Sequence, residues 1–318
     1  MPLPASLEGR LAVPAIAAPM FLVSGPDLVV EACRSGVLGT FPALNQRTTQ
    51  GFEDWLVEIE NRLDGANQTD GRGPAPYGVN LIVHKSNPRV QADLEICVKR
   101  KVPLIITSLG AVKEVVDAVH SYGGLIFHDV INTRHARKAA GAGVDGIIAV
   151  CAGAGGHAGL LTPFALVPEI RSFFDGTIIL SGAISTGAQV AAARALGADL
   201  AYLGTRFIAT KESLAPEAYK QMILGSTAGD IVYTPNVSGV NANFLRPSME
   251  ANGLDPDAPP GDHVMDMADE ARAWKTVWSA GQGVGSIRDV PGAAELCDRL
   301  RAEYRDAVSA LAAEDFAS

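Results

Sequence analysis

The length, composition and charge of the chain exclude several classes of protein. With 318 residues and 47% hydrophobic content, the chain is long enough to bury a large core. Its 35 acidic residues exceed the 26 basic ones, for a formal charge of −9, and the basic residues do not cluster, so no nucleic-acid partner is expected. The four cysteines lie far apart, without a Cys-x-x-Cys pair, which indicates neither a zinc site nor a disulfide framework.

The apolar runs are too short to cross a membrane. Those at 146–150 and 177–180 fall far below the roughly 20 residues of a spanning helix. The first ten residues lack a basic stretch followed by a long apolar run, so no secretion signal is predicted. These features predict a soluble, cytoplasmic protein without a membrane partner, and they do not indicate an oligomeric state.

Eight short, β-leaning apolar runs recur along the first two thirds of the chain, each bounded by Gly, Pro or polar residues, as in buried parallel strands. The predicted strands are 13–18, 37–41, 78–82, 104–107, 125–128, 146–150, 177–181 and 200–204. Between most of them, apolar residues three and four apart predict helices at 28–34, 52–63, 88–99, 112–121, 133–142 and 187–196. This alternation predicts a parallel sheet.

A doubly wound, dinucleotide-binding sheet is the alternative to a barrel. That fold requires a Gly-x-Gly-x-x-Gly turn after its first strand. Here the first strand is followed by Pro19-Met20-Phe21-Leu22, and no glycine comes before Gly25. Because eight units close a barrel more readily than they widen an open sheet, we predict an α/β fold of the (β/α)8, or TIM, barrel type.

The pattern changes after residue 205. Residues 225–263 are rich in Gly, Pro, Asn and Asp, which predicts long irregular excursions of the kind that form a lid or substrate wall. Helical spacing returns at 266–277 and 293–312. We therefore expect a single domain over 1–318, with the barrel at about 12–210 and a cap and C-terminal helices at about 211–318.

The turns after the last two predicted strands are candidates for binding a phosphate, which in TIM barrels commonly lies there. Ser181-Gly182-Ala183 and Gly204-Thr205 are small residues that let backbone N–H groups approach an anion. Ser185 or Thr186 is also expected to cap the next helix so that its N-terminus faces the phosphate. The two turns together predict a phosphate-bearing ligand.

His157 follows the sixth predicted strand, in Gly-Ala-Gly-Gly-His-Ala-Gly at 153–159. Glycines let the backbone approach a flat ligand, and an imidazole exchanges a proton near neutral pH. A surface-loop histidine is the alternative, but the place beside two phosphate turns favours an acid/base role.

Other residues at strand ends are weaker candidates. Met20 follows strand one and Asn80 lies at the end of strand three. There they are expected to contact an aromatic ring system, although a core methionine and a turn asparagine remain alternatives. One of His128 and Asp129 is expected to point into the barrel mouth. The spacing from His128 to His135 is not a His-Glu-x-x-His signature, and Ser181 lacks a Gly-x-Ser-x-Gly context, so neither a metal site nor a hydrolase triad is predicted.

Several of these motifs, in this order, resemble the nitronate monooxygenase family, formerly called 2-nitropropane dioxygenases. They are Ala-Pro-Met at 18–20, Gly-Val-Asn-Leu at 78–81, Ala-Gly-Gly-His at 154–157, Ser-Gly-Ala at 181–183, Gly-Thr-Arg-Phe at 204–207 and Ala-Gly-Gln-Gly at 280–283. The resemblance runs from about residue 13 to about residue 290. It implies an FMN-dependent oxidoreductase that uses oxygen to convert alkyl nitronates into a carbonyl compound and nitrite.

The resemblance also implies residue roles. The FMN phosphate would be held by Ser181, Gly182, Ala183, Gly204 and Thr205. The flavin ring would lie against Ala18, Pro19, Met20, Asn80 and Gly156. His157 would be the catalytic base, while the flavin carries the redox step.

Two alternatives remain at this point. The same barrel and loop occur in relatives similar to NAD(P)H:quinone reductases and FMN-dependent enoyl-acyl-carrier-protein reductases, in which NADH or NADPH would be the reductant. A barrel that binds a phosphorylated small molecule without flavin is the other.

Some relatives carry a lysine after the strand-five histidine, where this chain has Asp129, so a cation that could stabilise reduced flavin is missing. The candidate substrate-wall residues in the cap are Tyr233, Asn236, Asn241, Phe244 and Trp274.

Overall fold

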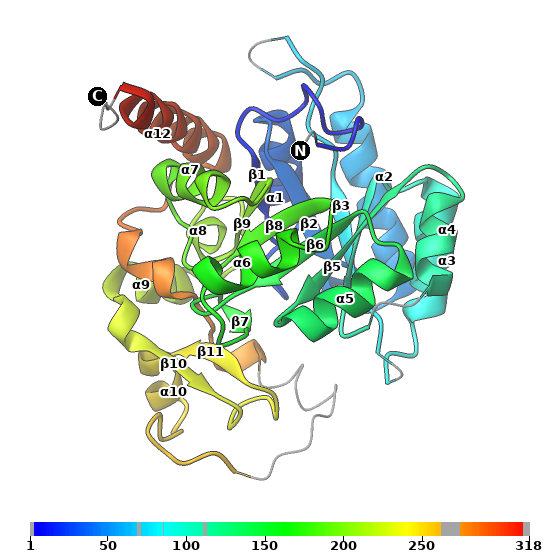
Figure 1. Ribbon diagram of the computed structural model, residues 1–318. Coiled ribbons are helices and arrows are strands. Elements are labelled where there is room, and N and C mark those ends of the chain that lie inside the picture. The colour runs from blue at the N-terminus through cyan, green and yellow to red at the C-terminus, as the bar shows by residue number, and fades with distance from the viewer. Residues whose placement is uncertain (1–2, 69–70, 85, 111–112, 262–273, 314–318) are drawn as a thin grey trace.

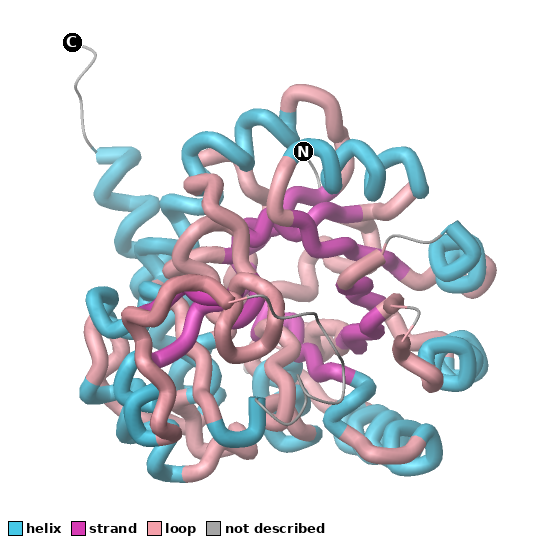
Figure 2. Tube along the Cα trace, turned by 90° about the horizontal axis from the view of Figure 1, so that it is seen from below, coloured by secondary structure: helices cyan, strands magenta, loops and turns pink. Residues whose placement is uncertain are grey.

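Eight parallel strands close into a barrel in the computed structural model, which describes residues 3–68, 71–84, 86–110, 113–261 and 274–313. The strands are β1 (Ala15–Ala17), β2 (Leu38–Pro42), β3 (Gly78–Ile82), β4 (Leu104–Ser108), β5 (Leu125–Val130), β6 (Gly146–Val150), β8 (Thr177–Ser181) and β9 (Leu200–Leu203). The last strand pairs in parallel with the first and so closes the ring, which Figure 2 shows with helices around it. The predicted TIM barrel is confirmed, and the predicted seventh and eighth strands are β8 and β9.

Apolar side chains fill the barrel. Ile16, Phe127 and Ile148 belong to one fully buried cluster, and Leu7, which precedes the first strand, joins it. A larger cluster packs the outer faces of the strands against the helices and includes Val29 and Phe52. The barrel is therefore a packed core and not a pore, which leaves its ends as the places for a ligand.

The six helices predicted between the strands are present, with ends shifted by no more than a few residues. They are α1 (Pro26–Arg34), α2 (Thr49–Leu63), α3 (Val90–Arg100), α4 (Lys113–His120), α5 (Thr133–Ala142) and α7 (Gly187–Ala195). No helix in the described part of the chain is both long and apolar enough to cross a membrane.

The sequence did not predict α6 (Pro163–Arg171), which lies between two barrel strands, nor the later helices α8 (Thr205–Ile208) and α9 (Glu217–Gly225). Two prolines lie in α6, and prolines indicate breaks in a helical pattern. Pro163 stands in the first turn, where no N–H is needed. Leu166, Val167 and Ile170 are buried, and this packing outweighs the hydrogen bond that Pro168 cannot make.

The terminal helix α12 (Ala293–Ala313) packs closely against the start of α7, as Figure 1 shows. A Cβ atom on Gly187 would lie 2.2 Å from the carbonyl oxygen of Leu300, so only glycine permits this approach. The Gly187 N–H donates to the carboxylate of Glu303 at 2.6 Å. The predicted helix at 293–312 is confirmed, whereas most of the one at 266–277 lies outside the described residues.

The prediction that 225–263 is irregular is wrong for its central part. Strands β10 (Ile231–Thr234) and β11 (Ala242–Leu245) form an antiparallel pair, and α10 (Arg246–Ala251) follows. Strand β11 also pairs with β7 (Gly156–His157), which belongs to the loop after β6. These strands are short, and β7 and β11 are far apart in sequence. The Gly- and Asn-rich composition of the region therefore did not indicate them.

Candidate functional site

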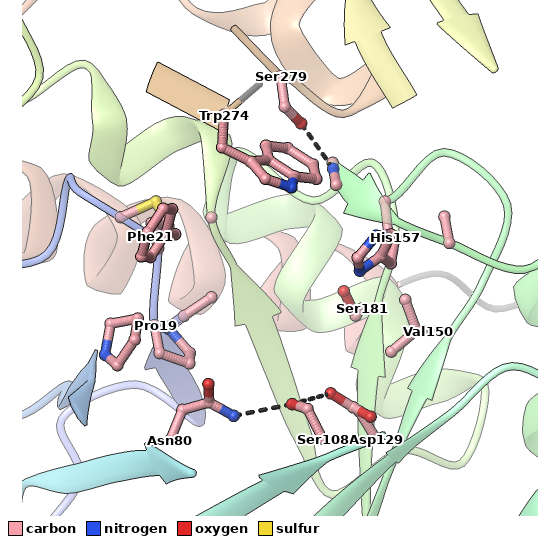
Figure 3. A pocket seen from close by; sticks show the side chains of 18 of the residues that line it. Pro19, Phe21, Asn80, Ser108, Asp129, Val150, His157, Ser181, Trp274 and Ser279 are labelled. Carbon is pink, nitrogen blue, oxygen red and sulfur yellow. Dashed lines mark hydrogen bonds between the residues drawn. The ribbon is translucent and has the colours of Figure 1, made fainter. Parts of the chain in front are cut away.

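A cavity of about 1240 Å³ opens at the carboxyl ends of the barrel strands, where TIM-barrel sites lie. It is lined by every residue that the sequence analysis placed at the ligand: Ala18, Pro19, Met20, Asn80, Gly156, His157, Ser181, Gly182, Ala183, Gly204 and Thr205. Figure 3 shows Pro19 and Asn80 on one side of the pocket, facing His157 and Ser181 on the other.

His157 is held by the cap as well as by the barrel. Its strand β7 pairs with β11, so that Ala242 lies opposite His157. The neighbouring Gly156 N–H donates to Ser279 Oγ at 2.7 Å, and this hydroxyl donates to the carbonyl of Asn243 at 2.7 Å. From its composition this loop looks like a flexible, glycine-rich segment, but its residues Gly156 and His157 are paired in a sheet. This pairing limits the positions that the imidazole can take.

The glycines of this loop are needed for its backbone shape and its packing. Gly153 and Gly156 have φ angles of +85° and +69°, in the left-handed region that favours glycine. A Cβ atom on Gly155 would lie 2.9 Å from the backbone nitrogen of Gly281. The loop thus packs backbone to backbone against the segment 280–283.

The segment 280–283 joins the three loops that carry the candidate site. The Gln282 N–H donates to the carbonyl of Gly153 at 2.9 Å. The Gly281 N–H donates to Thr205 Oγ1 at 2.8 Å, and Ser185 Oγ donates to the carbonyl of Gly283 at 3.0 Å. The motif Ala-Gly-Gln-Gly therefore holds the loops after β6, β8 and β9 together by hydrogen bonds. The sequence analysis did not predict this role.

The loop after β1 is positioned by a side chain that sequence reasoning also missed. Asn45 Nδ2 donates to the carbonyls of Met20 and Ser24, at 3.1 and 2.7 Å. Its Oδ1 accepts from the Leu22 N–H at 2.8 Å. One asparagine after β2 thereby fixes the loop that carries Pro19 and Met20.

The two small-residue turns leave room at the pocket wall. A Cβ atom on Gly204 would point toward Ala18 Cβ and Met20 Sδ, both 3.8 Å away, without a clash. Glycine is thus not required there by the protein itself, and its missing side chain keeps the wall open for a ligand. Ala183 adopts a φ of +54°, which is unusual for a residue with a side chain and typical of functional turns. A phosphate group fits this arrangement of small residues.

The expectation that the N-terminus of α7 faces the ligand is wrong. Thr186 does cap the helix, since its side chain accepts from the Gln189 N–H. However, Gln189 Oε1 accepts from the N–H groups of Ser185 and Thr186, at 2.7 and 3.1 Å, and Glu303 takes that of Gly187. These donors are used within the protein, so the helix start is covered by α12.

The floor of the pocket carries titratable groups from β5. His128 and Asp129 both line the cavity. Burial raises the pKa of Asp129 above its ordinary value and lowers the pKa of His128. His128 Nδ1 and Thr107 Oγ1 lie 2.8 Å apart, and Ser108 Oγ donates to Asp129 Oδ2 at 2.5 Å. Neither hydroxyl was singled out from the sequence, although both end an apolar strand run at the catalytic end.

The predicted substrate wall is correct in part. Tyr233, Asn241 and Trp274 line the cavity. Asn236 and Phe244 do not: Asn236 Nδ2 donates to the carbonyls of Ala258 and Pro259, and Phe244 packs on Trp274, with ring centroids 5.0 Å apart. Asn236 and Phe244 therefore stabilise the cap and do not line the cavity.

Comparison with known proteins identifies the family. A family model described as nitronate monooxygenase matches residues 9–303. The chain belongs to the nitronate monooxygenase family. This family-level prediction is confirmed, and the protein is an oxidoreductase of a flavin-using family.

Individual relatives of this nitronate monooxygenase family member agree with that placement. A nitronate monooxygenase from Paraburkholderia phytofirmans is 28% identical, and the match covers 94% of each chain. The structure of a nitroalkane oxidase from Streptomyces ansochromogenes has a TM-score of 0.81 at 25% identity and covers 96% of this chain and 100% of that one. FabK from Thermotoga maritima, at 24% identity with 96% of each chain covered, shares the fold, with a TM-score of 0.80.

Proposed function

We propose that this protein is an FMN-dependent nitronate monooxygenase, which uses oxygen to convert alkyl nitronates into a carbonyl compound and nitrite. The observation that carries the proposal is that His157 and both small-residue turns line one cavity at the catalytic end of the barrel. A single open cradle for phosphate, next to a wide cavity, supports FMN as the flavin.

In this proposal, the phosphate is bound by Ser181, Gly182, Ala183, Gly204 and Thr205. The ring contacts are Ala18, Pro19, Met20, Asn80 and Gly156. When bound, the flavin supplies the redox chemistry. The chain contributes the positioning of the ring and the substrate.

His157 is proposed as the general base toward neutral nitroalkanes. Its ring takes the proton from the carbon next to the nitro group, which produces the nitronate anion inside the pocket. The resulting imidazolium stays beside that anion and favours it electrostatically. A substrate supplied as the nitronate skips this proton transfer, so His157 then acts through its charge and its hydrogen bonding only.

The charge of the pocket mouth favours a second candidate, a flavin reductase that uses NADH or NADPH. Arg47, Lys138 and Lys275 are exposed residues of the cavity lining, and Asp129 is the one carboxylate among its described members. Arg47 follows β2 and Lys138 lies in α5, on the side of the barrel away from β8 and β9. We call Arg47, Lys138 and Lys275 the cationic arc. Although the chain has a net charge of −9, these three side chains would attract a second ligand that carries phosphates.

Three measurements on the purified protein separate these functions. We expect denaturation to release FMN, identified by its mass, and propyl-3-nitronate in air to give nitrite. Anaerobic mixing with NADH or NADPH should leave the flavin oxidised. Rapid bleaching by either nucleotide without nitrite formation would favour the reductase, and a colourless protein that releases no flavin would exclude both functions.

A further inference from the structure

The side-chain amide of Asn80 has a defined orientation at the pocket floor. Its Nδ2 donates to Ser108 Oγ at 2.8 Å and to the carbonyl of Ile106 at 3.3 Å. A backbone carbonyl can only accept a hydrogen bond, so the atom next to Ile106 must be the amide nitrogen. The amide oxygen then lies on the pocket side, as Figure 3 shows.

The Ser108 hydroxyl links Asn80 to a carboxylate by hydrogen bonds. It accepts from Asn80 and donates its single hydrogen to Asp129 Oδ2 at 2.5 Å. An ionised carboxylate accepts only, and it accepts strongly. While Asp129 is ionised, the hydrogen bonds can therefore run in one direction, from Asn80 through Ser108 to Asp129. The three residues come from the adjacent strands β3, β4 and β5.

We propose that Asp129 is a positioning residue that acts through Ser108 to keep the amide oxygen of Asn80 facing the pocket. There the oxygen accepts a hydrogen bond from an N–H group at the edge of the bound ring. The inference rests on the proposed function in one respect, namely that this ring is a flavin, which carries such an N–H in its pyrimidine part. A neutral Asp129 can donate to Ser108 instead, so that the Ser108 hydrogen points toward Asn80 and Ser108 no longer accepts from the amide. Only the longer hydrogen bond to the carbonyl of Ile106, at 3.3 Å, then holds the orientation of Asn80.

Charged and titratable groups surround Asp129 on several elements, and they decide when the relay holds. They are His128 on its own strand, His157 on β7, Tyr202 on β9, and His135 and Lys138 on α5, which face His128. A positive charge on His157 lowers the pKa of Asp129. Burial has the larger effect and raises the pKa of Asp129, so a charge on His157 favours the ionised carboxylate against that effect.

The test compares Ser108→Ala, Asp129→Asn and the double variant with Thr107→Val as a matched control. Thr107 is also on β4, and its hydroxyl meets the ring of His128, so the control loses a hydroxyl one residue away from the relay. The readouts are the Kd of FMN, the visible flavin spectrum between pH 5 and 9, and the flavin midpoint potential over the same range. None of them depends on turnover.

We expect Ser108→Ala to raise the Kd of FMN about fivefold, the effect of one lost net hydrogen bond. Asp129→Asn should remove the pH dependence that the wild-type spectrum and potential owe to this carboxyl group. The double variant should change no more than the stronger single variant, because both act on one relay. Thr107→Val, which leaves Asn80, Ser108 and Asp129 in place, should keep the Kd of FMN at its wild-type value.

Two results would overturn the proposal: flavin readouts of both single variants that match those of Thr107→Val, or additive effects in the double variant. Should Asp129→Asn fail to fold, Ser108→Ala and the pH dependence of the wild type decide. Nitrite formation tests a different claim. If the wild type forms no nitrite from nitronates but the variants show the expected changes in flavin Kd, spectrum and potential, the proposed substrate is wrong and the relay is still supported.

Discussion

His157 meets Trp274 edge to face, with ring centroids 5.6 Å apart and an interplanar angle of 88°. The histidine belongs to the loop after β6 and the tryptophan to the cap, so the candidate base is positioned by a contact between distant parts of the chain. Trp274 in turn packs on Phe244 of β11, the strand that pairs with β7. The cap therefore does more than cover the pocket, because it also orients His157.

Replacing His157 with Asn should lower kcat/KM for neutral nitroalkanes by about 100-fold to 10,000-fold, the usual contribution of a general base. Nitronates, which are already anionic, should lose much less. Nitrite release from matched pairs of nitroalkane and nitronate measures both values, with flavin content as the control. An equal loss on the two substrate forms would contradict the role as base.

Ser279→Ala should weaken the support of His157. The change removes the acceptor of the Gly156 N–H and the donor to Asn243, at a cost of about 1–3 kcal/mol in the free energy of unfolding, together with a lower kcat. Ser248→Ala is the matched control, since Ser248 Oγ accepts from the Trp278 N–H at 2.8 Å elsewhere in the cap. Urea unfolding and turnover should separate them: both variants lose stability, and only Ser279→Ala loses kcat.

Gly204→Ala tests the phosphate cradle. The backbone at this residue, with φ −99° and ψ −72°, accepts alanine, and the new Cβ clashes with nothing in the protein. The flavin-free protein should keep its stability or gain about 0.4–1 kcal/mol, while the Kd of FMN rises at least tenfold. An unchanged Kd, with the stability gain present, would remove Gly204 from the proposed site.

Glu303→Gln tests the expectation that the start of α7, whose Gly187 N–H is bonded to Glu303, does not bind the ligand. The glutamine retains an acceptor for the Gly187 N–H but removes a negative charge from the helix N-terminus, which should cost about 0.3–1 kcal/mol of stability. Flavin affinity should stay the same. A weaker Kd for FMN, measured by fluorescence titration, would show that the start of α7 contributes to the site after all.

Stability should depend on pH through Asp129. Because burial raises its pKa in the folded protein, the folded state holds the proton more tightly than the unfolded state does. The stability contributed by this group is present at acid pH and is lost as the pH rises through the folded-state pKa. Asp129→Asn should therefore unfold at higher urea than the wild type at pH 8, with a smaller gain near pH 4.5. A variant that is less stable at pH 8 would contradict the stated direction.

The sequence by itself determined the barrel and brought the candidate site residues to one of its ends. Strand and helix periods are local, and in a parallel barrel the residues that end each strand meet at one rim, so the turn at Ser181, the turn at Gly204 and the loop of His157 could be brought together without coordinates. The charge pattern along the chain, in contrast, gave no sign of the cationic arc at the mouth, since Arg47, Lys138 and Lys275 lie far apart in sequence.

Only the tertiary structure decided what surrounds and orients these groups. The pairing of β7 with β11, the burial of the α7 N-terminus under α12, and the relay from Asn80 through Ser108 to Asp129 each join residues from different elements. Local propensity carries no information on such partners, because a short strand, a helix end or a hydroxyl gains its stabilising contact only after the chain has folded. Tertiary packing likewise held α6 together across Pro168, against the local pattern.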